Sequence, residues 1–341
     1  MPTVLFPDGT HYVNPSVQQL ADKLSLTIRA SGDFYDLTII GGGPAGLMAA
    51  VYAAREDIST LVIDREALGG QAAITEKLDN FPAFDEGISG SELAERLGRQ
   101  TRRFGAETLV AQEVEALSIQ NGYKMVSTAL GDEYCSMALL LSPGSTYKRL
   151  GVPGEDAFIA AGIHFCATCD GPFYAGQELL VVGGGNSGVQ EAVFLTKFAT
   201  KVTIVEISDE LKASKILVER ALSDPKIEVL TGTSVQEFKG EQRLKSVVLK
   251  DSRSGEVREV HPAGAFIFIG MVPNTGFLEG VVDLDPWGYI KTSSNMETNV
   301  EGVFAAGDAR VGSTKQVAAA VGEGATAALM VRHYLDTHRS R

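Results

Sequence analysis

Two cysteines in the middle of the chain have the types and spacing that most directly suggest chemistry. Cys166 and Cys169 are separated by two residues, and Asp170 follows the second cysteine. A CxxC pair can close a small disulfide that opens and reforms readily, and a thiolate forms there when a nearby charge or helix N-terminus stabilises it. Asp170 is placed to hold or deliver the proton that thiol exchange requires. This stretch therefore predicts a redox-active disulfide.

Zinc is the competing interpretation of the pair, because zinc knuckles use the same spacing. A zinc site would need two further ligands. The remaining cysteine is Cys135, and the nearest histidine is His164. Neither a second CxxC nor an HxxxH pattern accompanies the pair. We therefore expect redox chemistry and no metal.

Length and charge argue against several classes of function. The 341 residues are enough for two domains of ordinary size. A net charge of -13, with acidic residues spread along the chain, argues against nucleic acid or an anionic membrane as a partner. No apolar run reaches the roughly 18 residues that span a bilayer, and residues 1–10 lack the pattern of a signal peptide. Three cysteines make no disulfide scaffold, so we expect a cytoplasmic protein.

A glycine-rich fingerprint precedes the cysteine pair. An apolar strand over residues 35–40 leads into GGGPAG at 41–46, a helix runs to about residue 55, and a strand over 60–63 ends at Asp64. In a Rossmann fold these glycines let the backbone approach a pyrophosphate at a helix N-terminus, and the acid binds a ribose hydroxyl. The segment therefore predicts a dinucleotide site.

The same pattern recurs after the cysteine pair. A strand over residues 179–182 leads into GGGNSG at 183–188, a helix runs to about 198, and a strand over 201–205 ends at Glu206. Two such patterns with a CxxC between them in sequence suggest that a flavin, a nicotinamide and a disulfide act in series. We predict an α/β fold with two Rossmann-like, three-layer domains, one inserted in the other.

The remaining segments fill in this plan. We expect a turn at 7–10, a helix that begins near 14–16, a helix over 89–104, short strands over 113–141, 235–249 and 258–269, a strand before Asp308, and a helix from 315 to about 334. The first fold is thus interrupted by the second and resumes after it.

From about residue 34 onward, the chain resembles the low-molecular-weight thioredoxin reductases. The matching motifs are GGGPAG (41–46), GGQ (69–71), CATCDG (166–171), GGGNSG (183–188), PNT (273–275), AAGD (305–308) and KQVAAAVGEG (315–324). The resemblance implies a flavin domain over 34–147 and 272–341, an inserted nucleotide-binding-type domain over 148–271 that carries the CxxC pair, and a homodimer. Residues 1–33 would form an N-terminal extension.

The resemblance also implies FAD as the cofactor and assigns residues to it. Those expected at its adenosine and pyrophosphate half are Gly41, Gly43, Gly46 and Asp64, and those expected along the ribityl chain and isoalloxazine are Gly70, Gln71, Asn80, Asp308 and Gln316. The cofactor-binding set is completed by Pro44, Ala45, Gly307, Lys315 and Val317. Cys169 would face the flavin and Cys166 the outer side, and the resulting dithiol would reduce thioredoxin or a similar protein.

The chain departs from the NADPH-dependent members at the end of the strand over 201–205. Those members carry a basic cluster there, which clamps the 2′-phosphate. Here Glu206 is followed by Asp209 and Glu210, with Lys212 as the only cation left. Glu206 would bind a free 2′-hydroxyl and repel a 2′-phosphate, so we do not expect NADPH to be the efficient donor.

Two interpretations of the electron donor stay open. In the first, NADH binds at Gly183, Gly185, Asn186, Ser187 and Glu206. In the second, this site is a relic, and ferredoxin or another non-nicotinamide donor supplies the electrons. A redox-regulatory flavoprotein is a further alternative, although the intact cysteine pair argues against it.

Three further features carry weaker expectations. Ser142-Pro143-Gly144 stands where the family usually has Ala-Thr-Gly, and Pro143 should stiffen the crossing between the domains. Cys135 and Trp287 are expected to be packing residues. His164 is expected to be structural, with a role as a proton donor near the disulfide as the alternative.

Overall fold

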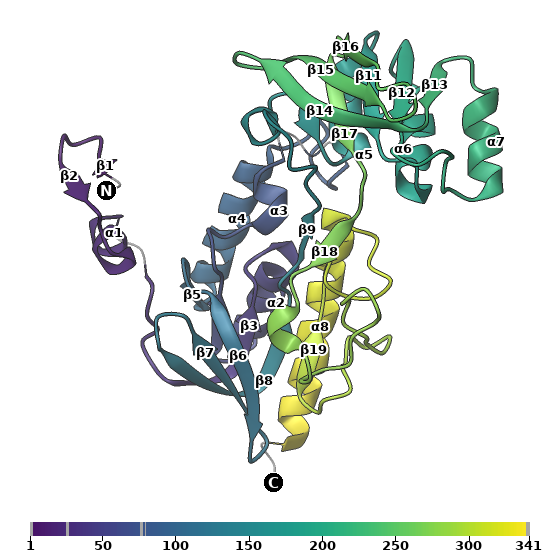
Figure 1. Ribbon diagram of the computed structural model, residues 1–341. Helices are drawn as coiled ribbons and strands as arrows, with labels where there is room; N and C mark the ends of the chain where they lie inside the picture. Colours follow the sequence, from purple (N-terminus) through teal and green to yellow (C-terminus); the bar gives the residue numbers. More distant parts are fainter. Residues whose placement is uncertain (1–2, 25–26, 76–77, 79, 339–341) are drawn as a thin grey trace. The chain divides into compact units, whose positions relative to one another are not determined.

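The computed structural model describes residues 3–24, 27–75, 78 and 80–338 (Figure 1). Contacts within the chain divide it into two compact units. Unit 1 comprises residues 1–73, 90–145 and 273–341, and unit 2 comprises residues 74–89 and 146–272. The chain crosses between them in β9 (Ser145–Tyr147) and β18 (Met271–Pro273), which pair with one another.

A mixed seven-stranded sheet forms the centre of unit 1. Its order is β5 (Glu107–Leu109), β4 (Thr60–Ile63), β3 (Phe34–Ile40), β8 (Glu133–Leu141), β7 (Tyr123–Thr128) and β6 (Val114–Gln120), with β19 (Val303–Ala305) also paired to β8. Strands β3, β4, β5, β8 and β19 pair in parallel. Strand β7 pairs antiparallel with both of its neighbours, β6 and β8. Every residue of β4 is buried, as expected for a strand covered on both faces.

Helices cover the sheet of unit 1. They are α2 (Pro44–Ala54), α3 (Gly70–Ala73), α4 (Gly90–Arg103) and α8 (Val317–His338), with a 3-10 turn at Gly276–Leu278. Helices α2 and α8 lie side by side (Figure 1). Their approach depends on small residues, because a Cβ on Gly324 would lie 2.1 Å from the carbonyl oxygen of Ala45. The fingerprint helix is therefore fixed against the last helix of the chain.

The N-terminal segment forms its own small elements. β1 (Thr3–Leu5) and β2 (His11–Val13) make a hairpin, and α1 (Val17–Leu24) follows. The predicted turn is present, with the Asp8 carboxylate accepting the amide of Thr10 at 3.0 Å. The following stretch is joined to edge strand β5, because Glu107 accepts hydrogen bonds from Ser31 and from the Tyr35 hydroxyl.

Unit 2 contains the second Rossmann pattern. Its parallel sheet has the order β10 (Ile163–His164), β17 (Gly264–Ile267), β11 (Glu178–Val182), β12 (Lys201–Val205) and β13 (Ile227–Leu230). The helices are α5 (Ala167–Asp170), α6 (Asn186–Leu195) and α7 (Lys215–Ser223), with 3-10 turns at Asp156–Phe158 and Gly171–Tyr174. An antiparallel sheet of β14 (Thr233–Gly240), β15 (Leu244–Asp251) and β16 (Val257–Val260) completes the unit.

The predicted α/β class with two Rossmann-like folds is confirmed. The expected strand region over 258–269 divides into β16 and β17, because Pro262 lacks an amide hydrogen and interrupts the ladder between two different sheets. Helix α7 was not predicted.

Within the described residues, no helix is both long enough and apolar enough to cross a membrane.

Candidate functional site

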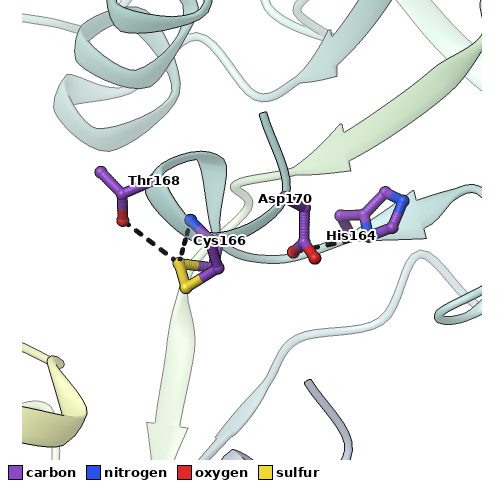
Figure 2. The surroundings of a disulfide bond; sticks show 5 residues. His164, Cys166, Thr168 and Asp170 are labelled. Atoms are coloured by element: carbon purple, nitrogen blue, oxygen red, sulfur yellow. Dashed lines mark hydrogen bonds and ion pairs between the residues drawn. A yellow bond between two sulfur atoms is a disulfide. The ribbon is translucent and has the colours of Figure 1, made fainter. Parts of the chain in front are cut away.

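Cys166 and Cys169 form the predicted disulfide. Cys166 is the N-cap of the short helix α5, and its sulfur accepts the backbone amide of Cys169 at 3.3 Å (Figure 2). The hydroxyl of Thr168 lies 3.3 Å from the same sulfur. Cys166 is half-buried, whereas Cys169 is only 6% exposed. Two donors thus already point at the sulfur that is more accessible to a partner molecule.

Asp170 is held in a buried chain of polar groups. Its Oδ2 lies 3.4 Å from Nδ1 of His164, and Nε2 of His164 lies 2.6 Å from the hydroxyl of Tyr174. Figure 2 shows the Asp170 carboxylate directed at the imidazole. The other carboxylate oxygen, Oδ1, is buried and has no hydrogen-bond partner among the described residues. A buried unpaired acceptor of this kind costs about 1 to 3 kcal/mol.

The first glycine fingerprint forms a cradle at the N-terminus of α2. Gly41 has φ +100°, and a Cβ there would lie 2.1 Å from the carbonyl oxygen of Ser142. A Cβ on Gly46 would lie 2.0 Å from the carbonyl oxygen of Gly41. By contrast, a Cβ on Gly43 would meet no atom within 4 Å. The outer glycines therefore allow tight packing, and the central one keeps the helix N-terminus open to a pyrophosphate.

Asp64 completes this first cradle. Its Oδ2 accepts the amide of Gly42 at 2.6 Å, and its Oδ1 accepts the amide of Glu66 at 2.7 Å. Burial raises the pKa of Asp64, although the two amides act in the opposite direction. Each carboxylate oxygen has a further lone pair, so the group can also accept hydroxyls of a ribose.

The second fingerprint repeats this geometry closely. A Cβ on Gly183, which has φ +117°, would lie 2.4 Å from the carbonyl oxygen of Phe268. A Cβ on Gly188 would lie 1.9 Å from that of Gly183, and one on Gly185 would meet nothing within 4 Å. This cradle at the N-terminus of α6 is therefore as open as the first.

Glu206 has the same place in the second cradle that Asp64 has in the first. Its Oε2 accepts the amide of Gly184 at 2.6 Å, and its Oε1 accepts that of Ser208 at 2.8 Å. Burial acts to raise the pKa of Glu206. The hydrogen bonds from Ser208 and Gly184 and the charge of Lys212 outweigh it, so that the pKa is lowered.

The AAGD motif and the start of α8 form one bonded loop in unit 1. The side chain of Glu323 accepts the amide of Gly307 at 2.7 Å and is paired with Arg310 at 2.6 Å. The backbone carbonyl of Asp308 accepts hydrogen bonds from the Ser145 hydroxyl at 2.7 Å and from the Lys315 ammonium. Burial raises the pKa of the Asp308 carboxyl. Gln316 and Val317 follow this loop, at the start of α8.

Residues 35–324 match the family described as pyridine nucleotide-disulphide oxidoreductase. The chain belongs to this family. It is 44% identical to the thioredoxin reductase of Bacillus subtilis (strain 168) over 303 residues, which cover 89% of this chain and 95% of the relative. It is 41% identical to that of Treponema pallidum (strain Nichols), covering 89% and 98%. The crystal structure of thioredoxin reductase from Streptococcus pyogenes MGAS5005 superposes with a TM-score of 0.85 at 39% identity, covering 90% and 100%.

Within the family, this reductase is one of the low-molecular-weight thioredoxin reductases, as its motifs indicated, and it is an FAD-dependent disulfide oxidoreductase. Its FAD fits the first cradle: the open surface at Gly43 admits a pyrophosphate, and Asp64 has acceptor capacity left for a ribose. The roles of individual residues stay predictions.

The flavin residues assigned between the two fingerprints lie in both units of the reductase. Gly70 has φ +54°, and a Cβ there would lie 3.2 Å from Cα of Gly43. Gly70 thus adjoins the first cradle in unit 1, and Gln71 follows it in α3. Asn80 belongs to the stretch that groups with unit 2. Its assignment to the flavin site stays a prediction.

The acidic loop after β12 contains a feature that the sequence did not reveal. Arg253, which follows β15, donates two hydrogen bonds to the carboxylate of Asp209, at 2.8 and 3.0 Å. Lys212 is the only cation within the run 205–212, and the fold brings Arg253 to this run as a second one. Arg253 and Asp209 are 44 positions apart, and backbone hydrogen bonds from Gly232 to Ser208 and from Ser252 to Gly232 join the loops that carry them. The side-chain oxygen of Asn186 is also engaged, since it accepts the amide of Ser214 at 2.7 Å.

One of the weaker expectations needs correction, and another can be made more definite. Trp287 is 76% exposed and is not a packing residue, because the Asp285 carboxylate accepts the amides of Trp287 and Tyr289 and turns the chain outward. Cys135 was expected to be a buried packing residue and is half-buried in β8, where desolvation raises its pKa.

The departure at Ser142 has a direct structural effect. Its hydroxyl lies 2.9 Å from the carbonyl oxygen of Gly41 and 3.1 Å from that of Ile40. An alanine could make neither contact. The serine therefore joins the end of β8 to the first glycine of the first fingerprint.

Proposed function

We propose that this reductase takes electrons from NADH and passes them through FAD and the Cys166–Cys169 pair to thioredoxin or a thioredoxin-like protein. The observation that carries the proposal is the disulfide itself, with a buried carboxylate beside it, in a chain that contains two complete dinucleotide cradles. The names of the relatives support a thioredoxin as the protein substrate.

FAD would be held at Gly41, Gly43, Gly46 and Asp64, with the Gly307–Val317 loop on the same unit as a second set of contacts. Bound FAD would supply two-electron chemistry between a nicotinamide and a disulfide. The chain's part is to orient the cofactor. Ser142 fixes the carbonyl of Gly41, and the Arg310–Glu323 pair fixes the amide of Gly307.

The cysteine pair would then reduce its substrate by thiol–disulfide exchange. The Cys166 thiolate attacks one sulfur of the substrate disulfide, which breaks that S–S bond, forms a mixed disulfide and releases one substrate thiolate. The Cys169 thiolate attacks the Cys166 sulfur, which restores the internal disulfide and releases the second thiolate. Each released thiolate takes up one proton. The greater exposure of Cys166 supports its role as the attacking cysteine.

Asp170 is suited to handle the protons of this cycle. Its buried Oδ1 is unpaired when the cysteines are oxidised, when neither sulfur carries a hydrogen. In the dithiol state, a thiol becomes available one residue away at Cys169. We infer that Oδ1 accepts the proton of that thiol as the second exchange step begins.

The choice of NADH rests on Glu206. A lowered pKa keeps its carboxylate ionised at neutral pH, so it can accept a ribose diol and would repel a 2′-phosphate. Two unit charges about 4 Å apart interact with about 1 to 4 kcal/mol between the dielectrics of water and of a protein surface. This corresponds to a discrimination of roughly 5- to 1,000-fold. The open surface at Gly185 supports a working nucleotide site over a relic.

Replacing Cys169 with Ser tests the function. We expect Cys169→Ser to retain FAD and to lose reduction of thioredoxin, because the internal disulfide can no longer form. The matched control is Cys135→Ser, which removes the cysteine in β8 and should leave the activity unchanged. Thioredoxin reduction by Cys169→Ser at the rate of the wild type would contradict the role of the pair.

A further inference from the structure

The buried imidazole of His164 is a titratable group that the proposed cycle has not used. We propose that His164 and Tyr174 are positioning residues that exchange protons with Asp170. This inference rests on the proposed function, because it assumes that Asp170 exchanges protons with the cysteine pair.

The relay has one contact on each side of the imidazole. Nδ1 lies 3.4 Å from Oδ2 of Asp170, and Nε2 lies 2.6 Å from the Tyr174 hydroxyl. His164 is 4% exposed and Asp170 is 5% exposed, so water competes little for either contact. Because the two ring nitrogens point in opposite directions, Tyr174 lies on the side of the ring away from Asp170.

Packing holds the relay in this orientation. The His164 ring lies edge-on to Tyr174 with centroids 5.4 Å apart, and Phe266 from β17 lies 5.3 Å away. The position of Tyr174 requires a glycine in β17, because a Cβ on Gly264 would lie 2.8 Å from its ring. The titratable groups that face the imidazole are Asp170 from α5 and Tyr174 from the adjoining 3-10 turn, while β17 presents Phe266.

A neutral imidazole in this place can carry a proton in both directions. With hydrogen on Nδ1, His164 directs a donor at the Asp170 carboxylate 3.4 Å away and accepts a hydrogen bond from the Tyr174 hydroxyl at Nε2. Transfer of the Nδ1 proton to Asp170, and of the Tyr174 proton to Nε2, leaves Asp170 neutral and His164 in its other tautomer. Tyr174, which is 7% exposed, regains a proton when a water molecule reaches its hydroxyl. Reversal returns one proton to water, so protons balance and no electrons move.

The relay explains why Asp170 uses its two oxygens differently. Oδ1, which is unpaired, is left for the thiol proton, and Oδ2, which faces His164, exchanges protons with the relay. A buried acid without such a path would have to wait for local opening to lose its proton. His164 therefore lets Asp170 return to its ionised form between successive turnovers.

Tyr174→Phe is the sharpest test, because it removes one hydroxyl and keeps the ring packing. We measure reduction of a thioredoxin by the FAD-loaded enzyme against pH, in H₂O and in D₂O. In the same holoenzyme, reduced with dithiothreitol, we measure cysteine alkylation by iodoacetamide against pH. Tyr134→Phe is the matched control, since Tyr134 is another buried tyrosine whose hydroxyl contacts a backbone amide in unit 1, at Ala30.

We expect Tyr174→Phe to reduce turnover about 10-fold and to raise the solvent isotope effect, within the range of general acid–base contributions. His164→Phe leaves the buried carboxylate without a partner. Because the imidazole no longer faces Oδ2, both the activity and the alkylation measured against pH should differ from those of the wild type. A role limited to packing would move neither the isotope effect nor the profile of Tyr174→Phe.

Two results separate the proposals. If Tyr174→Phe and His164→Phe keep the wild-type profiles while Asp170→Asn is impaired, the relay is wrong and the cysteine cycle stands. If the wild-type enzyme reduces no protein disulfide, the proposed function itself is wrong. If His164→Phe fails to fold, as judged by its FAD content, the pH profiles and isotope effect of Tyr174→Phe alone test the relay.

Discussion

The two dinucleotide cradles of this reductase are close copies of each other in their backbones. In each, the acid at the end of the second strand accepts the amide of the fingerprint's second glycine at 2.6 Å and an amide two residues further along the chain. They differ in their electrostatics. Burial raises the pKa of Asp64 in the first, whereas hydrogen bonds and Lys212 lower that of Glu206 in the second.

Their supports differ as well. The first cradle is fixed by Ser142 and by the packing of α2 on α8, as suits a cofactor that stays bound. The second has an exposed ion pair between Asp209 and Arg253 nearby. Local sequence sets the backbone that the two cradles share, and distant residues such as Ser142, Gly324 and Arg253 add the contacts in which they differ.

The largest expected effect comes from filling the first cradle. Gly43→Val should fold and lose most of its FAD, because the added side chain occupies the open surface of the helix N-terminus. Gly276→Val is the matched control, since its added side chain also meets open space in unit 1. Flavin absorbance per chain measures the difference. Full FAD content in Gly43→Val would show that the cradle is not the cofactor site.

A charge change in the second cradle should have the next largest effect. Glu206→Gln keeps the shape of the side chain and removes its charge, so the preference for NADH over NADPH should fall about 10-fold or more. The measurement is the anaerobic titration of the flavin with each nucleotide. Glu241→Gln, an exposed residue that pairs with Lys245, is the control. If Glu206→Gln kept the wild-type preference for NADH over NADPH, the charge of Glu206 would not be its cause.

The smallest effect should come from the ion pair beside the second cradle. Asp209→Asn frees Arg253 from its partner, and we expect binding of NADPH to improve about 2- to 5-fold, as for a single exposed charge pair. The double variant Asp209→Asn/Arg253→Met should lose this gain. Equal NADPH binding in all three proteins would mean that Arg253 does not reach the 2′-phosphate.

The sequence predicted those parts of the site whose residues lie close together in the chain. Both fingerprints, both terminal acids and the cysteine pair follow from glycine spacing and strand patterns, and the structure has these elements where they were expected. Such motifs are readable because their backbone geometry depends on neighbouring residues.

The rest depends on contacts between distant segments. Arg253 reaches Asp209 from 44 positions away in the chain, Glu323 reaches Gly307 across a loop, and no pattern marks Ser142 as a partner of Gly41. His164 was visible as a neighbour of the disulfide, but its contacts on both ring nitrogens were not. Trp287 was misjudged because its exposure is set by the turn at Asp285.

The most direct test of the account is an anaerobic titration of the purified holoenzyme with NADH and then NADPH, followed by the absorbance of oxidised flavin. We predict bleaching at a low concentration of NADH and only at a much higher concentration of NADPH. Bleaching by neither, with dithionite still reducing the flavin, would contradict the account and indicate a ferredoxin-like donor. Prompt bleaching by NADPH would show that Glu206 does not exclude the 2′-phosphate.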